Sequence, residues 1–147
     1  MNKPVWLLPL LLLPLAGTAA AQDVGACPYL SAETGLTWEH RGSPDSDFCR
    51  ALRADGSEAF GMTIAKNAPF KPKGANKAER VSIDGREVIW YRTEIAGSQV
   101  QARETVVKLP DGRVAYMWTQ ASSPEQLGQV LQQTQSLKFG ATRLSSN

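Results

Sequence analysis

Several side chains suited to binding or catalysis lie on three neighbouring predicted strands in the C-terminal half of the chain. They supply an indole, two guanidinium groups and two carboxylates, in Trp90, Arg92, Glu94, Arg103 and Glu104, and the rings of Tyr91 and Trp118 belong to the same cluster. Glu94 and Glu104 could serve as a carboxylate pair, because burial raises the pKa of a carboxyl group until it acts as a general acid. Trp and Arg are also enriched where proteins bind one another. These residues therefore predict a binding surface or a hydrolase site, and the alternative for most of them is ordinary cross-strand pairing and core packing.

A lysine-bearing stretch, residues 66–79, is a second candidate binding segment. Helix and central strand are both disfavoured here by the residues that break them, Pro69, Pro72 and Gly74. We predict a long loop, in which Phe70, Lys71 and Lys73 could contact an anionic surface or partner. An ordinary solvated loop is the alternative.

The sequence lacks the motifs of the common nucleophilic and metal-dependent enzymes. It contains no G-x-S-x-G stretch and no S-x-x-K motif with its partners. His40 is the single histidine, so a metal site with two histidine ligands is excluded. The motifs therefore predict no catalytic residue, no metal and no cofactor.

Residues 1–21 have the pattern of a cleaved signal peptide. A short basic start containing Lys3 precedes an apolar run from Val5 to Leu15, and small residues follow up to Ala21. The apolar run is shorter than the roughly 20 residues that a membrane-spanning helix needs. We expect cleavage after Ala21 and a mature chain without a transmembrane segment, located in the bacterial periplasm or secreted.

The remaining chain, residues 22–147, has the size of a single domain. The whole sequence holds 16 basic and 14 acidic residues, and loss of Lys3 with the signal peptide brings these numbers closer together. A nearly neutral protein lacks the basic excess that is typical of nucleic-acid binders. We therefore predict one domain that does not bind nucleic acid.

Cys27 and Cys49 are the only cysteines of the chain. An exported protein meets an oxidising environment, so two cysteines predict a disulfide between them. The alternative is a lipid anchor on Cys27, because Val24 to Cys27 has the character of an acylation site. Gln22 and Asp23 separate this cysteine from the apolar run and favour the disulfide.

The hydrophobic pattern predicts an α+β fold. Alternating apolar residues between turn formers indicate an antiparallel meander of about six to seven strands, at 36–41, 47–54, 58–65, 80–83, 87–95, 100–109 and 113–121. Pro28 to Thr34 predicts a short N-terminal helix ended by Gly35. A C-terminal helix from about Pro124 to Ser136, capped by Ser123, is expected to pack on one face of the sheet. Residues 140–147 are expected to form a frayed tail.

Turns at Gly97-Ser98 and Pro110-Asp111-Gly112 predict the register of the last three strands, and the register predicts the two faces of the sheet. The more apolar face is the predicted core and holds Ile89, Tyr91, Ile95, Val100, Val106, Val114, Tyr116 and Trp118. The amphipathic face holds Val88, Trp90, Arg92, Glu94, Arg103, Thr105, Val107 and Met117. Glu104 falls on the predicted core face. Because burial of an unpaired carboxylate is costly, we expect it to pair with an arginine of the N-terminal strands, Arg41, Arg50 or Arg53, or to anchor a ligand at the edge of the sheet.

The order of these elements resembles small bacterial envelope domains of the PsbP/Mog1/DcrB type. The similarity lies in a cysteine, a short helix, a strand with a second cysteine, a meander and a C-terminal helix that ends in Ser136-Leu137-Lys138-Phe139. The resemblance implies a non-enzymatic accessory or binding role and carries over no functional residue. We therefore expect an exported protein that binds a protein partner in the envelope, as an inhibitor, immunity protein or assembly factor. The alternative is an envelope hydrolase that uses Glu94 and Glu104.

Overall fold

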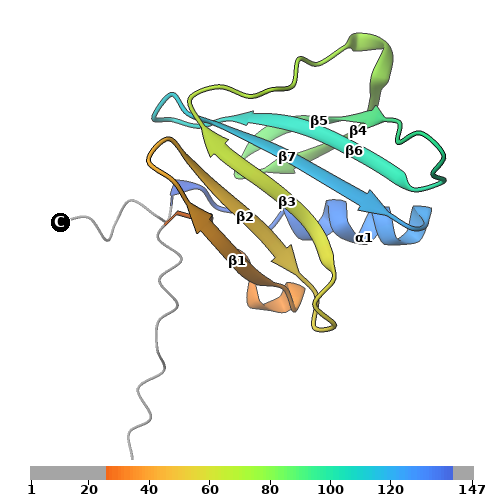
Figure 1. Cartoon of the computed structure of the whole chain (residues 1–147), viewed down its shortest axis with the longest axis horizontal. Coiled ribbons are helices and arrows are strands. Elements are labelled where there is room, and N and C mark those ends of the chain that lie inside the picture. Colours follow the sequence, from red (N-terminus) through yellow and green to blue (C-terminus); the bar gives the residue numbers. More distant parts are fainter. Residues whose placement is uncertain (1–25, 141–147) are drawn as a thin grey trace, which may run out of the picture.

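One seven-stranded antiparallel sheet organises residues 26–140, the part of the chain that the computed structural model describes (Figure 1). Its strands are β1 (Thr37–Gly42), β2 (Ser46–Leu52), β3 (Glu58–Ala65), β4 (Lys77–Ile83), β5 (Arg86–Thr93), β6 (Gln101–Lys108) and β7 (Val114–Ala121). A C-terminal helix, α1 (Pro124–Thr134), covers one face. The predicted class of sheet and helix is thus confirmed. The predicted signal peptide and residues 141–147 of the predicted tail lie outside the described residues.

Two meanders, β1-β2-β3 and β4-β5-β6-β7, meet in the middle of the sheet. The strand order is β1-β2-β3-β7-β6-β5-β4, because β3 pairs with β7. The prediction of one simple meander is therefore wrong at this step. Residues 66–76 carry the chain from the centre of the sheet to its far edge and end in a 3-10 turn, η2 (Gly74–Asn76). The predicted loop 66–79 is shorter than expected, because Lys77 already begins β4.

The predicted register of β5, β6 and β7 is correct, but the predicted core lies on the wrong face. Tyr91 is opposite Glu104, and Glu104 is opposite Trp118. Helix α1 packs on the other face, where the largest wholly buried side chains are Trp90, Phe60, Met62, Ile83 and Met117. We call the face on which α1 packs the covered face, and the opposite face the open face.

Helix α1 begins at a well-formed cap and buries one stripe of side chains. The Ser123 hydroxyl accepts a hydrogen bond from the Gln126 amide at 3.1 Å, and the Gln126 side chain accepts one from the Ser122 amide at 2.7 Å. The buried stripe is Leu127, Val130, Leu131 and Thr134. Within the described residues, the helices are too short and too polar to cross a membrane.

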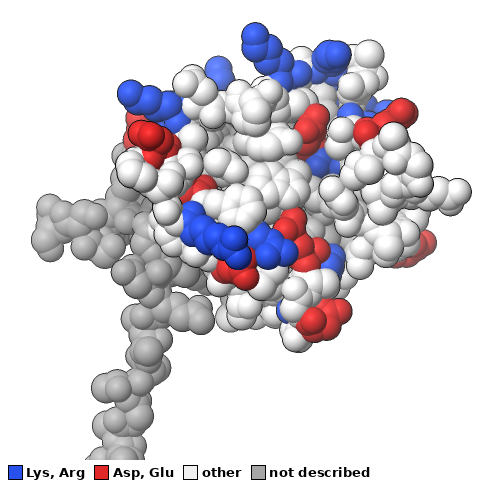
Figure 2. All heavy atoms as spheres, viewed as in Figure 1, with Lys and Arg blue, Asp and Glu red and all other residues white. Residues whose placement is uncertain are grey.

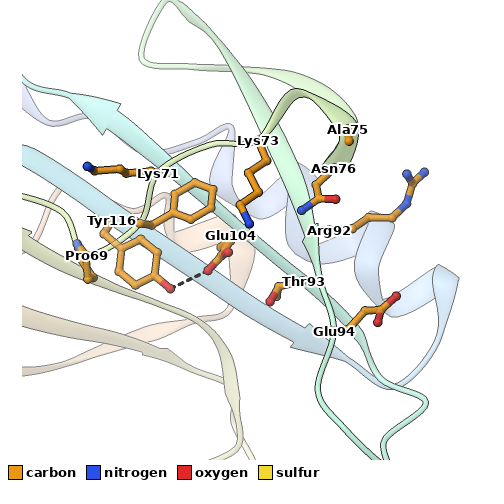
Figure 3. Close-up of a pocket in the computed structure, with 11 residues that line it drawn as sticks. Pro69, Lys71, Lys73, Ala75, Asn76, Arg92, Thr93, Glu94, Glu104 and Tyr116 are labelled. Carbon is orange, nitrogen blue, oxygen red and sulfur yellow. Dashed lines mark hydrogen bonds between the residues drawn. The ribbon is translucent and has the colours of Figure 1, made fainter.

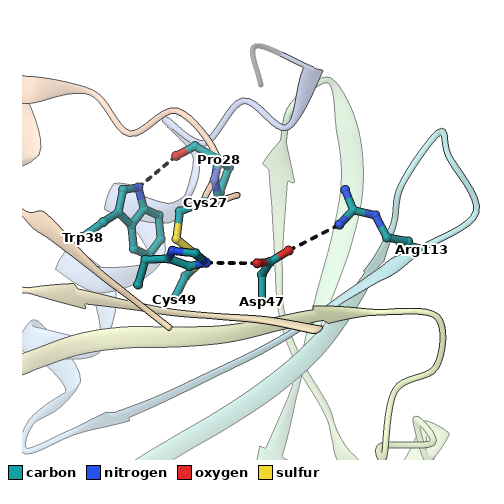
Figure 4. Close-up of a disulfide and its surroundings, with 7 residues drawn as sticks. Cys27, Pro28, Trp38, Asp47, Cys49 and Arg113 are labelled. Carbon is teal, nitrogen blue, oxygen red and sulfur yellow. Dashed lines mark hydrogen bonds and ion pairs between the residues drawn. A yellow bond between two sulfur atoms is a disulfide. The ribbon is translucent and has the colours of Figure 1, made fainter. Parts of the chain in front are cut away.

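The disulfide between Cys27 and Cys49 ties the N-terminal segment to β2 and confirms the predicted pairing (Figure 4). Both cysteines are buried, and a sulfur held in this bond cannot be acylated. Beside it, the Trp38 indole donates a hydrogen bond to the Pro28 carbonyl at 2.8 Å. The segment that follows forms a single 3-10 turn, η1 (Ala32–Thr34), and not an α-helix.

The C-terminal segment after α1 returns to the N-terminal segment. The backbones of Tyr29 and Lys138 form one isolated bridge, in which each amide donates to the other residue's carbonyl. Buried Leu137 and Phe139 flank this bridge and belong to the core. The two ends of the described chain therefore pack together on the covered face.

Candidate functional site on the open face

Five aromatic rings lie next to one another across the open face. Phe48 is 5.7 Å from Trp118 between ring centroids, and Trp118 is 5.5 Å from Tyr116. Phe70 on the loop lies 6.0 Å from Tyr116 and 5.6 Å from Tyr91. We call these five residues the aromatic strip. All five are half-buried, so part of each ring contacts solvent.

The position of Trp118 within the strip depends on Gly61 of β3. The two residues are cross-strand partners, and the indole rests on the glycine backbone. A Cβ atom at position 61 would lie 2.4 Å from Cζ2 of Trp118, which is far inside van der Waals contact. Glycine is therefore required for the indole to lie against the sheet.

Charged side chains of β1, β2 and the first residue of β3 continue the strip. Arg50 donates to Glu39 at 2.9 Å and to Glu58 at 2.7 Å, and Glu58 accepts the indole N–H of Trp118 at 2.9 Å. The hydrogen bonds from Arg50 to Glu58 and Glu39 raise the pKa of this guanidinium, so it stays protonated. Figure 2 shows basic and acidic atoms gathered on this part of the open face, and further basic atoms at the opposite rim. The network fixes Trp118 from one side.

Glu104 of β6 holds Tyr116 at the other side of the strip. The Tyr116 hydroxyl donates to Glu104 at 2.8 Å (Figure 3). Burial, followed by this hydrogen bond, raises the pKa of Tyr116 from 10.0 to about 12. The expected ion pair between Glu104 and an N-terminal arginine is not formed, because Arg50 binds Glu39 and Glu58 instead. Glu104 can dispense with an arginine because the open face leaves it partly solvated.

A pocket of about 630 Å³ lies between the loop and the ends of the strands (Figure 3). Its lining is Pro69, Phe70, Lys71, Lys73, Ala75, Asn76, Arg92, Thr93, Glu94, Glu104 and Tyr116. We call it the loop pocket. Figure 3 shows the amine of Lys73 pointing from the loop toward Glu104, whereas Lys71 and Arg92 extend along the rim in opposite directions.

Six of the eight candidate binding residues taken from the sequence line this one pocket. They are Phe70, Lys71, Lys73, Arg92, Glu94 and Glu104. The other two are on the covered side of the sheet: Trp90 is wholly buried in the core, and Arg103 is 7% exposed. Arg103 is held by Glu79 of β4 through hydrogen bonds of 2.8 and 2.9 Å. These two residues stabilise the fold and do not line the loop pocket.

The geometry does not favour the carboxylate pair of the hydrolase hypothesis. Glu94 and Glu104 both line the loop pocket, but Figure 3 shows their carboxylates pointing in different directions. Glu104 also accepts the Tyr116 hydroxyl, which engages one of its oxygens. Among residues 26–140, His, Cys, Asp and Glu side chains do not gather in threes that could bind a metal ion.

The sequence-based list of binding candidates omitted most rings of the aromatic strip and the groups that hold them on the open face. The omitted residues are Glu39, Phe48, Arg50, Glu58, Gly61, Tyr91, Tyr116 and Trp118. Three of them, Tyr91, Tyr116 and Trp118, had been placed in the core. The signal that could have found them is Glu104, because a carboxylate among rings indicates a face that meets water.

Comparisons with protein-family models, curated proteins and solved structures found no match. The resemblance to PsbP/Mog1/DcrB domains therefore stays an expectation drawn from the order of the elements.

Proposed function

We propose that the protein is an exported binding or accessory protein that takes its partner on the open face. The observation that carries this proposal is that one face of the sheet is covered by other parts of the chain and the other is not. Helix α1 and the terminal segments bury one face, while the other keeps a pre-arranged strip of rings beside a pocket. A half-exposed aromatic surface of this kind is typical of interaction sites.

The arrangement of the open face also favours binding over a purely structural role. The polar groups of Trp118 and Tyr116 are already hydrogen-bonded to Glu58 and Glu104. Side chains fixed before binding lose less conformational entropy when a partner arrives. The open face is therefore suited to binding a partner without rearrangement of these side chains.

The proposal of export is supported by the disulfide. The Cys27–Cys49 bond joins the N-terminal segment to β2, and such bonds persist in oxidising compartments. Together with the signal-like residues 1–21, this favours the periplasm or the outside of the cell.

Capture from an envelope extract of the source cells tests the proposed function. The disulfide-bonded protein is immobilised as wild type, as Phe70→Ala and as Tyr29→Ala. Tyr29 is a matched control, because it is an aromatic residue that is 51% exposed and lies away from the aromatic strip. We expect a component that wild type and Tyr29→Ala retain and Phe70→Ala loses, with unfolding curves confirming that all three proteins are folded.

The retained material is analysed for proteins, which the sequence predicts as partners, and also for glycans, because the experiment itself does not fix the class of partner. Equal retention by all three proteins, or retention lost only in Tyr29→Ala, would contradict a binding role for the open face.

A further inference from the structure

The aromatic strip presents flat apolar surfaces that are held in fixed positions. Trp118 rests on Gly61 and is tied to Glu58, while Tyr116 is tied to Glu104. A sugar ring has one or two faces made of C–H groups, and these faces stack on aromatic rings. Rigid Trp and Tyr rings supply such contact area at a low entropic cost. The strip therefore has the shape and stiffness for stacking with a row of sugar rings.

The loop pocket offers hydrogen-bond donors and acceptors on opposite walls. Lys73 and Asn76 donate from the loop side, and Glu104 accepts from the sheet (Figure 3). Lys73 takes part in no ion pair or side-chain hydrogen bond within the described residues, so its amine is available to a ligand. A sugar hydroxyl both donates and accepts, so it can bridge two such walls. Phe70 and Tyr116 of the strip also line the pocket, so the two sites are continuous.

The mixture of charges disfavours strongly charged ligands. A polyanion at the lysine-bearing rim would also face Glu94 and Glu104, and a polycation would face Lys71 and Lys73. An apolar ligand would strip water from these groups without replacing their hydrogen bonds, which is costly. A ligand without net charge that carries many hydroxyl groups complements both signs at once.

We propose that the open face binds an uncharged oligosaccharide chain, whose sugar rings stack along the aromatic strip and whose hydroxyl groups enter the loop pocket. This inference rests on the proposed function, because it names the ligand class of the same surface. Glu104 and Lys73 bind hydroxyl groups from the two walls, and Phe70 and Tyr116 contact the sugar ring at the pocket.

Titration calorimetry with uncharged hexasaccharides of glucose, mannose, xylose and N-acetylglucosamine tests the inference. The protein is the disulfide-bonded wild type, and tryptophan fluorescence is followed in parallel. We expect saturable binding of at least one hexasaccharide, a fluorescence change, and little dependence on salt because the ligand has no charge. Glu104→Gln and Phe70→Ala should each weaken binding at least tenfold, whereas Tyr29→Ala should bind as wild type does.

The outcomes separate this inference from the proposed function. If no hexasaccharide binds, or if Glu104→Gln and Phe70→Ala bind as wild type does, the oligosaccharide inference is overturned. Binding of polygalacturonate or polylysine in place of the uncharged sugars would also overturn it. If the hexasaccharides fail while a captured protein depends on Phe70, the proposed function stands with a different ligand. Unfolding curves of every variant exclude loss of fold as the cause.

Discussion

The two faces of the sheet both carry aromatic side chains, but they place them in different surroundings. The covered face buries Phe60 and Trp90 in the core to which the stripe of α1 also belongs. The open face arranges Phe48, Tyr116 and Trp118 in a row and leaves each partly exposed. Aromatic content alone therefore does not identify the core of this protein.

The difference lies in how polar groups are satisfied. On the covered face, the hydroxyl of Thr105 donates to the Ile89 carbonyl at 2.7 Å, and that of Thr119 to the Ala59 carbonyl at 2.8 Å. Such bonds from a side chain to a neighbouring strand's backbone let polar side chains enter a core at little cost. On the open face the bonds join side chains on different strands, as from Tyr116 to Glu104. The first pattern stabilises packing, and the second holds a surface in place.

Two phenylalanines on neighbouring strands give the strongest test of this contrast. Phe60 is fully buried and packs against Trp38 on the covered face, whereas Phe48 packs against Trp118 on the open face. Phe60→Ala should lower the free energy of unfolding by about 3–5 kcal/mol, as other large-to-small core changes do. Phe48→Ala should cost about 1 kcal/mol, because less of its area is removed from water. Urea denaturation measures both, and equal losses would mean that the open face is a second core.

Helix α1 gives the next largest effect and tests which of its sides faces the sheet. Leu131 is 7% exposed and belongs to the core, while its neighbour Gln132 is exposed. Leu131→Ala should lower the free energy of unfolding by about 2–5 kcal/mol. Gln132→Ala should change it by less than about 0.5 kcal/mol. Similar values for the two variants would argue that α1 does not cover this face.

Glycine-to-alanine changes on the two layers should have opposite signs. Gly61→Ala should destabilise the protein by about 1–3 kcal/mol, because the new methyl group collides with the Trp118 indole. Gly128→Ala in α1 meets no neighbouring atom and should stabilise by about 0.5–1 kcal/mol through higher helix propensity. Denaturation curves give both values. A neutral Gly61→Ala with unchanged near-ultraviolet circular dichroism would show that Trp118 does not rest on this glycine.

The sequence was sufficient for the features that local signals determine. Turn residues around Gly97 and Asp111 fixed the register of three strands, and the capping pattern at Ser123 placed the start of α1. The disulfide followed from two cysteines and from the expectation of export. Each of these inferences needed only neighbouring residues or a simple count.

The features that sequence reasoning missed depend on contacts between distant segments. The pairing of β3 with β7 is one such contact, and the position of α1 on the face of Met117 is another. The covered face looked amphipathic because it carries polar residues such as Arg103 and Thr119. In the folded protein these side chains find partners on other strands, Glu79 and Ala59. A face that carries polar residues in the sequence can therefore still be buried. For this reason Trp90 and Arg103, two of the binding candidates, lie in the covered layer and not at the loop pocket.

The smallest expected effect concerns the pH dependence that Tyr116 gives to the open face. Because burial and the bond to Glu104 raise its pKa from 10.0 to about 12, the folded protein favours the protonated phenol. This contribution to stability is complete below about pH 10 and is lost as the pH rises toward 12. After allowance for solvent screening at a half-buried site, it amounts to about 1–2 kcal/mol. Tyr116→Phe should remove it, so the difference in unfolding free energy between wild type and Tyr116→Phe should shrink by this amount between about pH 9 and about pH 12. A difference that stays constant over this range would mean that Tyr116 titrates as a solvent-exposed tyrosine and that Glu104 does not hold it.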